Sequence, residues 1–218
     1  MLETYASSSA LADACAVAVA QRLAQGLDQR GRASLVATGG RSPGPVYDRL
    51  ARTDLDWAHV AVTLSDERQV DADSPSSNAR LLRERLFVGA AARAQFLPLT
   101  DYAEPVLRKL MPFDAVMLGV GEDGHVASLI PGSPVLAHAM DAGGQALTAE
   151  SPQGFGSPPT ARITLTLAAL LQSRAIFLLI AGEAKRQVIS RAEAGEALPV
   201  AAILGQDRVP VRVFWSPN

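Results

Sequence analysis

The sequence predicts an α/β fold, in which a single domain spanning residues 1–218 holds a doubly wound, mostly parallel sheet with helices on both faces. Two observations support this prediction. Apolar runs typical of fully buried strands alternate with helical patterns along the chain, as in parallel sheets covered on both sides. In addition, 218 residues of which 48% are hydrophobic can bury one sizeable core, so two small domains are the less economical arrangement.

The order of the elements follows from these runs and from the residues between them. An Ala-rich segment over 7–27 predicts the first helix, and "ASLVAT" predicts a buried strand that ends before Pro43, where a new helix can start. The runs "HVAVTLS", "DAVMLGV" and "RAIFLLIAG" predict further strands. A helix is predicted at "ARLLRERLF", after the first of them, and another at "EAKRQVISRAEAG", after the last. In full, the predicted helices are 7–27, one from Pro43, 79–87, 103–110 and 183–195; the predicted strands are 33–38, 59–65, 96–99, 114–120, 145–151, 161–166, 174–182 and 209–215.

The composition limits the classes of function. A formal net charge of −2 argues against a dedicated nucleic-acid-binding protein, which needs a basic face, but it allows a small anion to be held by a few local cations. The single cysteine, Cys15, excludes an intramolecular disulfide and favours a reducing cytoplasm. We find no signal peptide and no run of about 20 apolar residues, so no membrane span is expected. The expected state is a monomer, with a weak dimer as the alternative.

Polar clusters follow four of the predicted parallel strands. "TGGRSP" follows the first strand, "SDERQV" the second, "GVGEDGH" a middle strand and "AGEAK" a late one. The carboxyl ends of the strands in an open α/β sheet meet at one crevice, which is where such folds bind ligands. We therefore expect these four clusters to lie together in space.

The cluster after the first strand has the features of a phosphate-binding loop. Gly39 and Gly40 free the backbone N–H groups to face outward, and a helix starting near Pro43 adds its positive end. The hydroxyls of Thr38 and Ser42 complete a suitable phosphate cradle. An ordinary strand-to-helix turn with Ser42 as its N-cap is an equal alternative on this evidence.

Cations and carboxylates in two other clusters are candidates for the same crevice. Neighbouring side chains in a strand point to opposite faces, so at most one or two of Asp66, Glu67 and Arg68 face it. Arg68 suits a phosphate, although a solvated pair with Glu67 is an equal alternative. Asn78 stands at a predicted helix start, where capping is its ordinary role. Lys185 opposes the dipole of the helix it opens, a small penalty that contact with an anion would offset, although an ordinary exposed lysine is the favoured alternative on this evidence alone.

The loop "LGVGEDGHVASLIPGS" contains G-x-G-x-x-G at Gly119, Gly121 and Gly124, the pattern of a dinucleotide-binding turn. That turn should open a long helix early in the chain and precede an acidic residue about 20 positions further on. Here the glycines come halfway along the chain, and Pro131 follows Gly124 after seven residues. The pattern therefore does not predict a dinucleotide site.

The triplet Asp123-Gly124-His125 in this loop is better suited to general acid–base chemistry. A histidine titrates near neutral pH, and a neighbouring carboxylate can orient its ring. His59 and His138 have no comparable polar neighbours. No H-x-x-x-H, C-x-x-C or G-x-S-x-G spacing occurs, so neither a zinc site nor a nucleophile elbow is expected. We expect water attack on, or proton abstraction from, a phosphorylated small molecule.

Taken in order, "TGGRSP", "SDERQV" with "SPSSN", "LGVGEDGHVASLIPG", "ARITLT" and "AGEAK" resemble the motifs of the 6-phosphogluconolactonase family. The resemblance covers residues from about 33 to about 190. It implies hydrolysis of 6-phospho-D-glucono-1,5-lactone in the oxidative pentose phosphate pathway, without a metal or other cofactor. It also implies a fold similar to that of the glucosamine-6-phosphate deaminases.

The resemblance further implies a role for each matching residue. His125 is the general base and acid, and Asp123 is its partner. Separately from the resemblance, we hypothesise that Asp66 aligns water or a sugar hydroxyl. Val126 and Ile130 replace the usual Thr and Phe, and both keep size or apolarity. The expected substrate-binding and phosphate-binding residues are Gly39, Gly40, Arg41, Ser42, Arg68, Asn78, Arg162 and Lys185, with Arg162 the weaker candidate.

Two alternative functions share this architecture. The deaminases continue after the histidine into Asn-Glu-Pro, whereas this chain has Leu129-Ile130-Pro131 and lacks the carboxylate that assists ring opening. A non-catalytic sugar-phosphate sensor would carry an additional DNA-binding helix pair, for which the chain has neither room nor basic charge. Both alternatives are therefore disfavoured.

Overall fold

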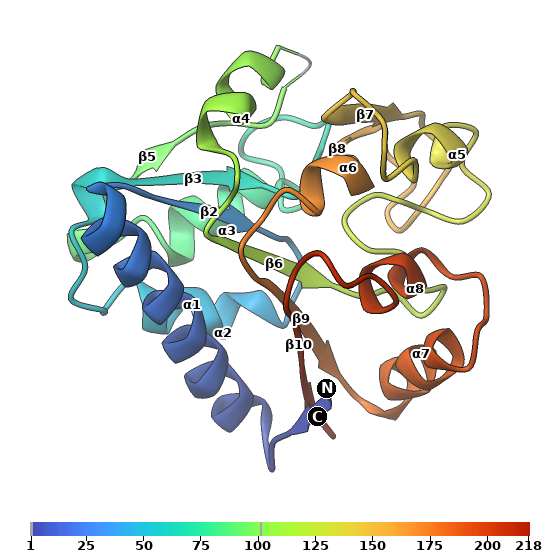
Figure 1. Cartoon of the computed structure of the whole chain (residues 1–218), viewed down its shortest axis with the longest axis horizontal. Coiled ribbons are helices and arrows are strands. Elements are labelled where there is room, and N and C mark those ends of the chain that lie inside the picture. Colours follow the sequence, from blue (N-terminus) through green and yellow to red (C-terminus); the bar gives the residue numbers. More distant parts are fainter. Residues whose placement is uncertain (1, 101) are drawn as a thin grey trace.

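A parallel sheet of seven strands forms the centre of the molecule (Figure 1). The structure is a computed structural model and describes residues 2–100 and 102–218. Every neighbouring pair of strands in this sheet runs parallel. From one edge to the other the strands are β1 (Leu2–Thr4), β10 (Val211–Ser216), β9 (Ile176–Ala181), β6 (Ala115–Gly119), β2 (Ala33–Ala37), β3 (Val60–Leu64) and β5 (Gln95–Phe96).

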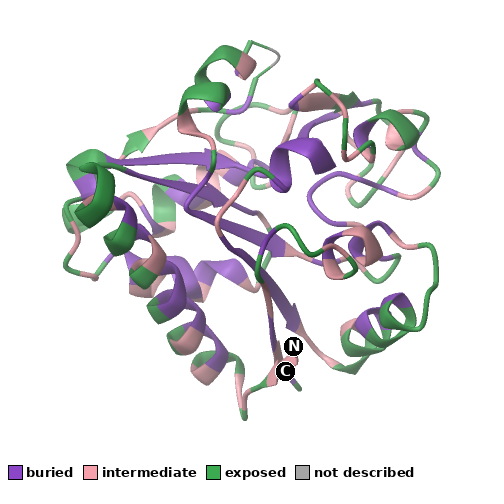
Figure 2. Cartoon of the chain, viewed as in Figure 1, coloured by how far each residue is buried: buried purple, intermediate pink, exposed green. Residues whose placement is uncertain are grey.

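Helices cover both faces of this sheet. Figure 1 shows α1 and α2 on one side of the sheet and α7 and α8 on the other. The strands between them are buried along most of their length (Figure 2). The α-helices are α1 (Ser8–Arg30), α2 (Pro43–Leu50), α3 (Asn78–Arg85), α4 (Glu104–Leu110), α5 (Leu136–Ala139), α6 (Leu167–Leu170), α7 (Glu183–Glu193) and α8 (Pro199–Leu204), with 3₁₀ turns η1 (Trp57–His59) and η2 (Gly89–Arg93). This arrangement confirms the predicted doubly wound α/β fold.

The winding direction of the chain reverses between β2 and β6. From β2 the chain proceeds outward to β3 and β5, and it then returns to place β6 on the other side of β2, followed by β9 and β10. The loops after β2 and β6 diverge at this point, which leaves a crevice at the carboxyl ends of the strands. The glycine loops of the sequence lie at this crevice.

A second sheet of three antiparallel strands adjoins the first, with the order β4 (Asp66–Arg68), β8 (Arg162–Leu165), β7 (Thr148–Ser151). The strands predicted at 145–151 and 161–166 thus exist, but they lie outside the parallel sheet. Asp66 pairs with Thr164 and Arg68 with Arg162, so residues nearly a hundred positions apart become neighbours. This sheet brings Arg162 to the same edge of the molecule as the loops after β2 and β6.

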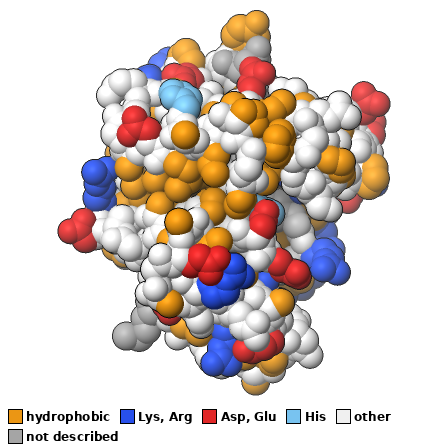
Figure 3. Space-filling view, turned by 90° about the vertical axis from the view of Figure 1, so that its right-hand side faces the viewer, with side chains coloured by type: hydrophobic (Ala, Val, Ile, Leu, Met, Phe, Trp, Pro, Cys, Tyr) orange, Lys and Arg blue, Asp and Glu red, His pale blue; other side chains and the backbone are white. Residues whose placement is uncertain are grey.

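On the face shown in Figure 3, Lys and Arg side chains lie among Asp and Glu side chains, and an apolar area crosses the upper middle. This is the right-hand side of Figure 1, where α5, α7 and α8 lie. The charges on this face are therefore mixed. No helix among residues 2–100 and 102–218 is both long and apolar enough to cross a membrane.

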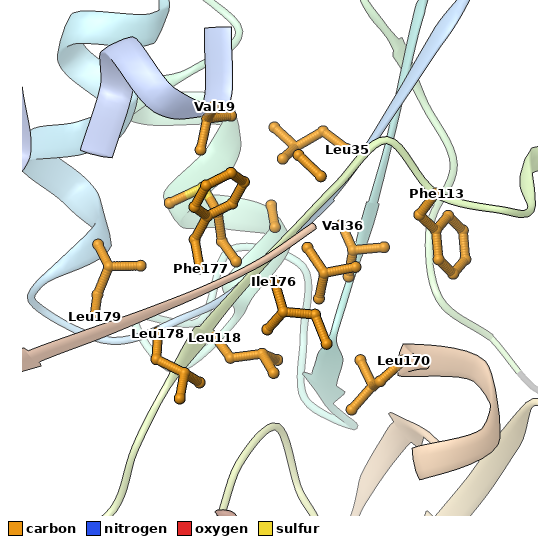
Figure 4. Close-up of a cluster of buried hydrophobic side chains, with 14 of the residues drawn as sticks. Val19, Leu35, Val36, Phe113, Leu118, Leu170, Ile176, Phe177, Leu178 and Leu179 are labelled. Atoms are coloured by element: carbon orange, nitrogen blue, oxygen red, sulfur yellow. The ribbon is translucent and has the colours of Figure 1, made fainter. Parts of the chain in front are cut away.

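The core is built from strand residues whose side chains alternate between the two layers of helices. Phe177 of β9 points toward Val19 of α1, whereas Ile176 lies on the other side of the strand with Leu118 and Leu170 (Figure 4). All five side chains are essentially inaccessible to solvent. Because both faces of each strand are buried, the strands are continuous apolar runs in the sequence.

Candidate active site

A cavity of about 180 Å³ opens at the point where the winding direction reverses. It brings together residues from the loops after β2 and β6, from β4 and β8, and from the starts of α3 and α7. All four polar clusters predicted to meet contribute to it. The lining residues are Thr38, Gly39, Gly40, Asp66, Arg68, Asn78, Gly119, Val120, Gly121, His125, Ala127, Ser157, Arg162 and Lys185.

His125 is held in this cavity by Asp123. The ring Nδ1 of His125 lies 2.6 Å from Oδ1 of Asp123, and the same oxygen accepts the backbone N–H of His125 at 3.2 Å. This hydrogen bond to His125 is the main cause of a lowered pKa of Asp123, which keeps that carboxyl ionised. With Nδ1 engaged as a donor, Nε2 is the ring nitrogen left to act as a base.

Gly121 makes room for this pair. A β-carbon at position 121 would lie 2.2 Å from Nδ1 of His125 and 2.5 Å from Oδ1 of Asp123. The Gly121 N–H also donates to the His125 carbonyl at 2.9 Å, which closes the loop. A glycine in this loop is thus required by the position of the imidazole ring.

Three cations line the same cavity as His125. Arg68 donates from Nη1 to the Ser76 carbonyl at 2.7 Å, and Arg162 donates from Nη2 to the Pro158 carbonyl at 2.8 Å. Their buried Nε atoms have no hydrogen-bond partner among the residues that the structure describes. Lys185 is the third cation, from the first turn of α7. The cavity therefore presents unpaired donors of the kind that an anion satisfies.

Burial affects the protonation of these cations. It is the largest cause of a lowered pKa of Lys185, followed by the nearby charge of Arg41, while Glu122 opposes the change. Burial and then Arg68 lower the pKa of Arg162, and Asp66 opposes them. A guanidinium remains charged at neutral pH despite such changes. The uncompensated positive charge in the cavity would favour binding of an anion.

The carboxylate of Asp66 connects the loop after β6 to the second sheet. It accepts the Ser128 hydroxyl at 2.6 Å and the Ser65 hydroxyl at 3.0 Å, and it lies 3.7 Å from Nη1 of Arg162. Asp66 and Arg162 are 4% and 3% exposed. An ion pair this deeply buried needs such additional hydrogen bonds to be tolerated. These contacts give Asp66 a structural role at the floor of the cavity.

The side chain of Glu67 caps α3. Its oxygens accept the backbone N–H groups of Arg68, Asn78 and Ala79, each at 2.7 Å. Glu67 and Arg68 are therefore not the solvated ion pair considered as an alternative. The N-cap residue is Ser77, and Asn78 instead donates from its side-chain amide to the Asp66 carbonyl at 2.8 Å. Glu67 thereby fixes two cavity residues, Arg68 and Asn78.

The loop after β2 divides between two cavities. Gly39 and Gly40 line the cavity that contains His125, whereas Arg41 and Ser42 line an adjacent cavity of about 400 Å³. Lys185 lines both. Ser42 occupies the N-cap position of α2, but its side chain makes no capping hydrogen bond. The structure thus does not bring Arg41 and Ser42 into the cavity with the other predicted phosphate-binding residues.

A family model described as "Glucosamine-6-phosphate isomerases/6-phosphogluconolactonase" matches residues 6–215. The chain belongs to this family. It is 42% identical over 225 residues to the 6-phosphogluconolactonase of Caulobacter vibrioides, with 99% of this chain and 97% of that protein covered. The resemblance predicted from the motifs is confirmed.

Solved structures of the family have the same fold. The crystal structure of a 6-phosphogluconolactonase from Shewanella baltica superposes with a TM-score of 0.91 at 37% identity, covering 99% of this chain and 97% of that one. A monomeric glucosamine-6-phosphate deaminase superposes with a TM-score of 0.74 at 18% identity, covering 97% and 96%. The second comparison establishes a shared fold only.

Val120, Ala127 and Ser157 line the cavity of this family member but had not been singled out from the sequence, and neither had Ser128 beside Ala127. Ser157 lies in the Pro/Gly-rich segment, which carries no chemical pattern of its own. Ala127 adopts a left-handed conformation, with φ of 50°. Its neighbour Ser128 is anchored by the bond to Asp66 and by a backbone N–H bond to Thr164 Oγ1 at 3.1 Å. In the sequence, the contact between Ser128 and Asp66 was indicated only by the presence of a serine three positions after His125.

Candidate metal ligands do not cluster in the described parts of this family member. Among residues 2–100 and 102–218, no group of three His, Cys, Asp or Glu side chains is placed to hold an ion.

Proposed function

We propose that this protein hydrolyses 6-phospho-D-glucono-1,5-lactone to 6-phosphogluconate. The observation that carries the proposal is the meeting of one oriented histidine and three cations in a single cavity. The names of its relatives in Caulobacter vibrioides and Shewanella baltica support the same activity. The substrate has a phosphate at one end and an electrophilic carbonyl at the other, so it needs both kinds of group.

In this proposal Arg68, Arg162 and Lys185 hold the 6-phosphate. The unpaired Nε atoms of both arginines offer donors, and a guanidinium matches the oxygens of a phosphate. The backbone N–H groups of the Gly39-Gly40 turn lie in the same cavity, and Gly40 has a positive φ of 98°. We assign these N–H groups to the oxyanion that forms at C1.

The proposed reaction needs one base and returns its proton. Nε2 of His125 removes a proton from water as the water oxygen attacks C1 of the lactone. Asp123 stabilises the imidazolium that results. The tetrahedral intermediate then collapses, the bond from C1 to the ring oxygen breaks, and His125 returns its proton to that oxygen. The carboxylic acid product ionises at neutral pH, so each turnover releases one proton to solvent.

The deaminase alternative finds no support at the corresponding position. Leu129 and Ile130 stand where the resemblance places Asn and Glu in deaminases, and both are buried apolar residues. A ring-opening carboxylate is therefore missing from this loop.

The direct test is acid release from freshly prepared lactone, with the spontaneous rate subtracted at each pH. We expect His125→Asn to lower kcat by about 10²- to 10⁴-fold, the usual range for a general acid–base residue. The variant should still bind 6-phosphogluconate, which excludes misfolding as the cause. A variant that binds the product normally and retains wild-type kcat would contradict the assignment.

The phosphate assignment has a separate readout. We expect Arg68→Ala and Lys185→Ala to raise KM more than they lower kcat, because the phosphate is remote from C1. Unphosphorylated gluconolactone should be a poor substrate of the wild-type enzyme. Similar kcat/KM values for both lactones would show that the phosphate site is wrongly placed.

Two further expectations remain proposals. We propose that the protein acts as a monomer, which sedimentation velocity would test, and that it works in the cytoplasm with its small-molecule substrate. Localisation of a tagged full-length chain would test the second.

A further inference from the structure

A second large cavity lies at the opposite edge of the parallel sheet. Its volume is about 520 Å³, and it is formed by the amino ends of β2, β3, β5 and β6 together with the end of α4. Ala33 and Ser34 line it at the start of β2, whereas Thr38 lines the catalytic cavity just beyond the end of this strand. At about 3.3 Å per residue, the two cavities are about 15 Å apart.

Basic side chains outnumber acidic ones in this cavity. Arg30, Arg32, Lys109 and Arg174 line it, and Asp114 is the carboxylate that faces them among the described lining residues. His59 also lines the cavity, but its ring is bound to the Asp56 carboxylate, with 2.7 Å between Nδ1 and Oδ2.

Asp114 does not neutralise these cations. One of its oxygens forms an ion pair with Arg30 and lies 3.4 Å from Nε of Arg174. The other oxygen accepts the backbone N–H of Ser34 at 2.9 Å. Both oxygens are therefore engaged, and one carboxylate is shared by two arginines.

Three of the cations retain free hydrogen-bonding capacity. Arg174 Nε is buried and, although it lies 3.4 Å from Asp114 Oδ1, it forms no hydrogen bond in the part of the chain that the structure describes. Arg32 and Lys109 are exposed, and neither forms an ion pair with any residue of 2–100 or 102–218. A buried unpaired N–H group is unfavourable, and an anion in the cavity would satisfy it.

Most of the remaining wall of the cavity is apolar. Val106, Leu110, Met111, Pro112 and Leu97 line it beside the cations. Cavities of roughly 300–1,000 Å³ with apolar walls and a few convergent polar groups are typical of small-molecule sites. A methionine thioether also makes favourable contacts with aromatic rings. A ligand that matches both the basic side chains and the apolar wall has an anionic group and a flat apolar body.

We propose that this cavity is a second binding site, specific for a nucleotide-like organic phosphate. The phosphate contacts Arg32, Lys109 and Arg174, and the heterocycle lies against the wall formed by Met111 and Pro112. The site is separate from the catalytic cavity and does not depend on the proposed lactonase activity.

The test uses ADP as the probe, with adenosine and inorganic pyrophosphate as its two halves, titrated calorimetrically into the full chain. We expect one ADP site per chain and weaker binding of either half alone. The double variant Arg32→Ala/Lys109→Ala should weaken ADP binding by at least about tenfold, since each lost charge-assisted bond has an effect of this order. Arg174→Ala should weaken it similarly.

Two control variants locate the binding. Arg191→Ala removes an exposed arginine of α7, which is paired with Glu196, and should leave ADP affinity unchanged. Lys185→Ala removes a cation of the catalytic cavity and should also leave it unchanged. Loss of ADP binding in Lys185→Ala would place the nucleotide in the catalytic cavity and overturn the proposal. No binding at millimolar ADP, or equal affinity for pyrophosphate and ADP, would overturn it as well.

Discussion

Gly121 determines where the imidazole ring of His125 can lie, because any larger residue would place its β-carbon on Nδ1 of that ring. We expect Gly121→Ala to displace the ring and break its hydrogen bond to Asp123. If His125 is the base, kcat should then fall by about 10²-fold or more. Thermal unfolding, measured in parallel, should show that the fold survives.

A matched glycine substitution controls for the loss of backbone freedom. The β-carbon of Gly143→Ala would meet only Asp141 Oδ1, at an ordinary 3.5 Å. This variant should retain wild-type kcat. Equal losses in the two variants would mean that the space beside the His125 ring is not the cause.

The lowered pKa of Lys185 leads to a prediction for the pH dependence of binding. Lysine binds phosphate only when protonated, and burial makes Lys185 lose its proton below the ordinary lysine pKa of 10.5. As the pH rises through this lowered pKa, affinity for 6-phosphogluconate should fall. Calorimetric titration of this stable product avoids the alkaline hydrolysis of the lactone.

Lys185→Arg separates this titration from other effects of pH. A guanidinium keeps its charge throughout the alkaline range, so the variant should bind with an affinity that changes little with pH. An identical alkaline decline in the wild type and in Lys185→Arg would assign the decline to another group.

The start of α3 is held by Glu67 of β4 in addition to its own N-cap, Ser77, whose hydroxyl accepts the Arg80 N–H at 3.1 Å. Removing this carboxylate in Glu67→Ala leaves the N–H groups of Arg68, Asn78 and Ala79 without their acceptor. We expect the free energy of unfolding to fall by about 1–3 kcal/mol. KM should also rise, because Arg68 and Asn78 line the cavity. Urea unfolding and steady-state kinetics measure the two effects.

A glutamate within α3 itself provides the comparison. Glu84 is exposed and pairs with Arg80 one turn away, a contact that contributes little to stability. Glu84→Ala should therefore change the free energy of unfolding by less than about 0.5 kcal/mol. If both variants are equally stable, the cap is not what holds α3.

The central parallel strands that the sequence predicted share one property, which is burial on both faces. Strands β2, β3 and β9 are continuous apolar runs because helices cover both sides of the sheet, so their positions were apparent from local sequence. Because the strands are apolar, the polar clusters stand out in the loops that follow them, and this allowed the position of the cavity to be predicted.

Two strands that were missed, β1 and β4, depend on contacts distant in sequence. Strand β4 is the polar segment Asp66–Arg68 and exists because it pairs with β8 nearly a hundred residues later. Strand β1 has only three residues, and its partner is β10 at the far end of the sequence. The capping role of Glu67 likewise needs α3 to fold back on β4. Local patterns carry no information about such pairings.

The sheet as a whole depends on β1 to cover one edge. Glu3 of β1 accepts two hydrogen bonds from Arg212 of β10, at 2.6 and 2.8 Å, and Tyr5 stacks on Phe214 with ring centroids 5.7 Å apart. Deleting residues 2–5 would expose β10 as a free edge strand. Such edges invite pairing with other chains, so we expect a lower Tm and increased self-association.

A substitution at Glu3 separates the effect of losing the backbone pairing of β1 from the effect of losing its charge. Glu3→Gln keeps the backbone pairing of β1 and removes only a partly exposed ion pair, so Tm should fall by no more than a few degrees, about 2–4 °C per kcal/mol. Size-exclusion chromatography should show self-association in the deletion alone. Comparable self-association of the deletion variant and of Glu3→Gln would mean that loss of the Glu3 charge, and not the free edge of β10, causes it.

The position of β10 between β1 and β9 also sets the order in which the molecule can be completed during translation. A nascent chain that has emerged from the ribosome through residue 193 already carries every residue that lines the catalytic cavity, yet its sheet still ends at β9. Val200, whose N–H donates to the Gly124 carbonyl, supports the histidine loop only when α8 follows. Strand β1, although among the first segments synthesised, waits for residues 211–216 before it has a partner.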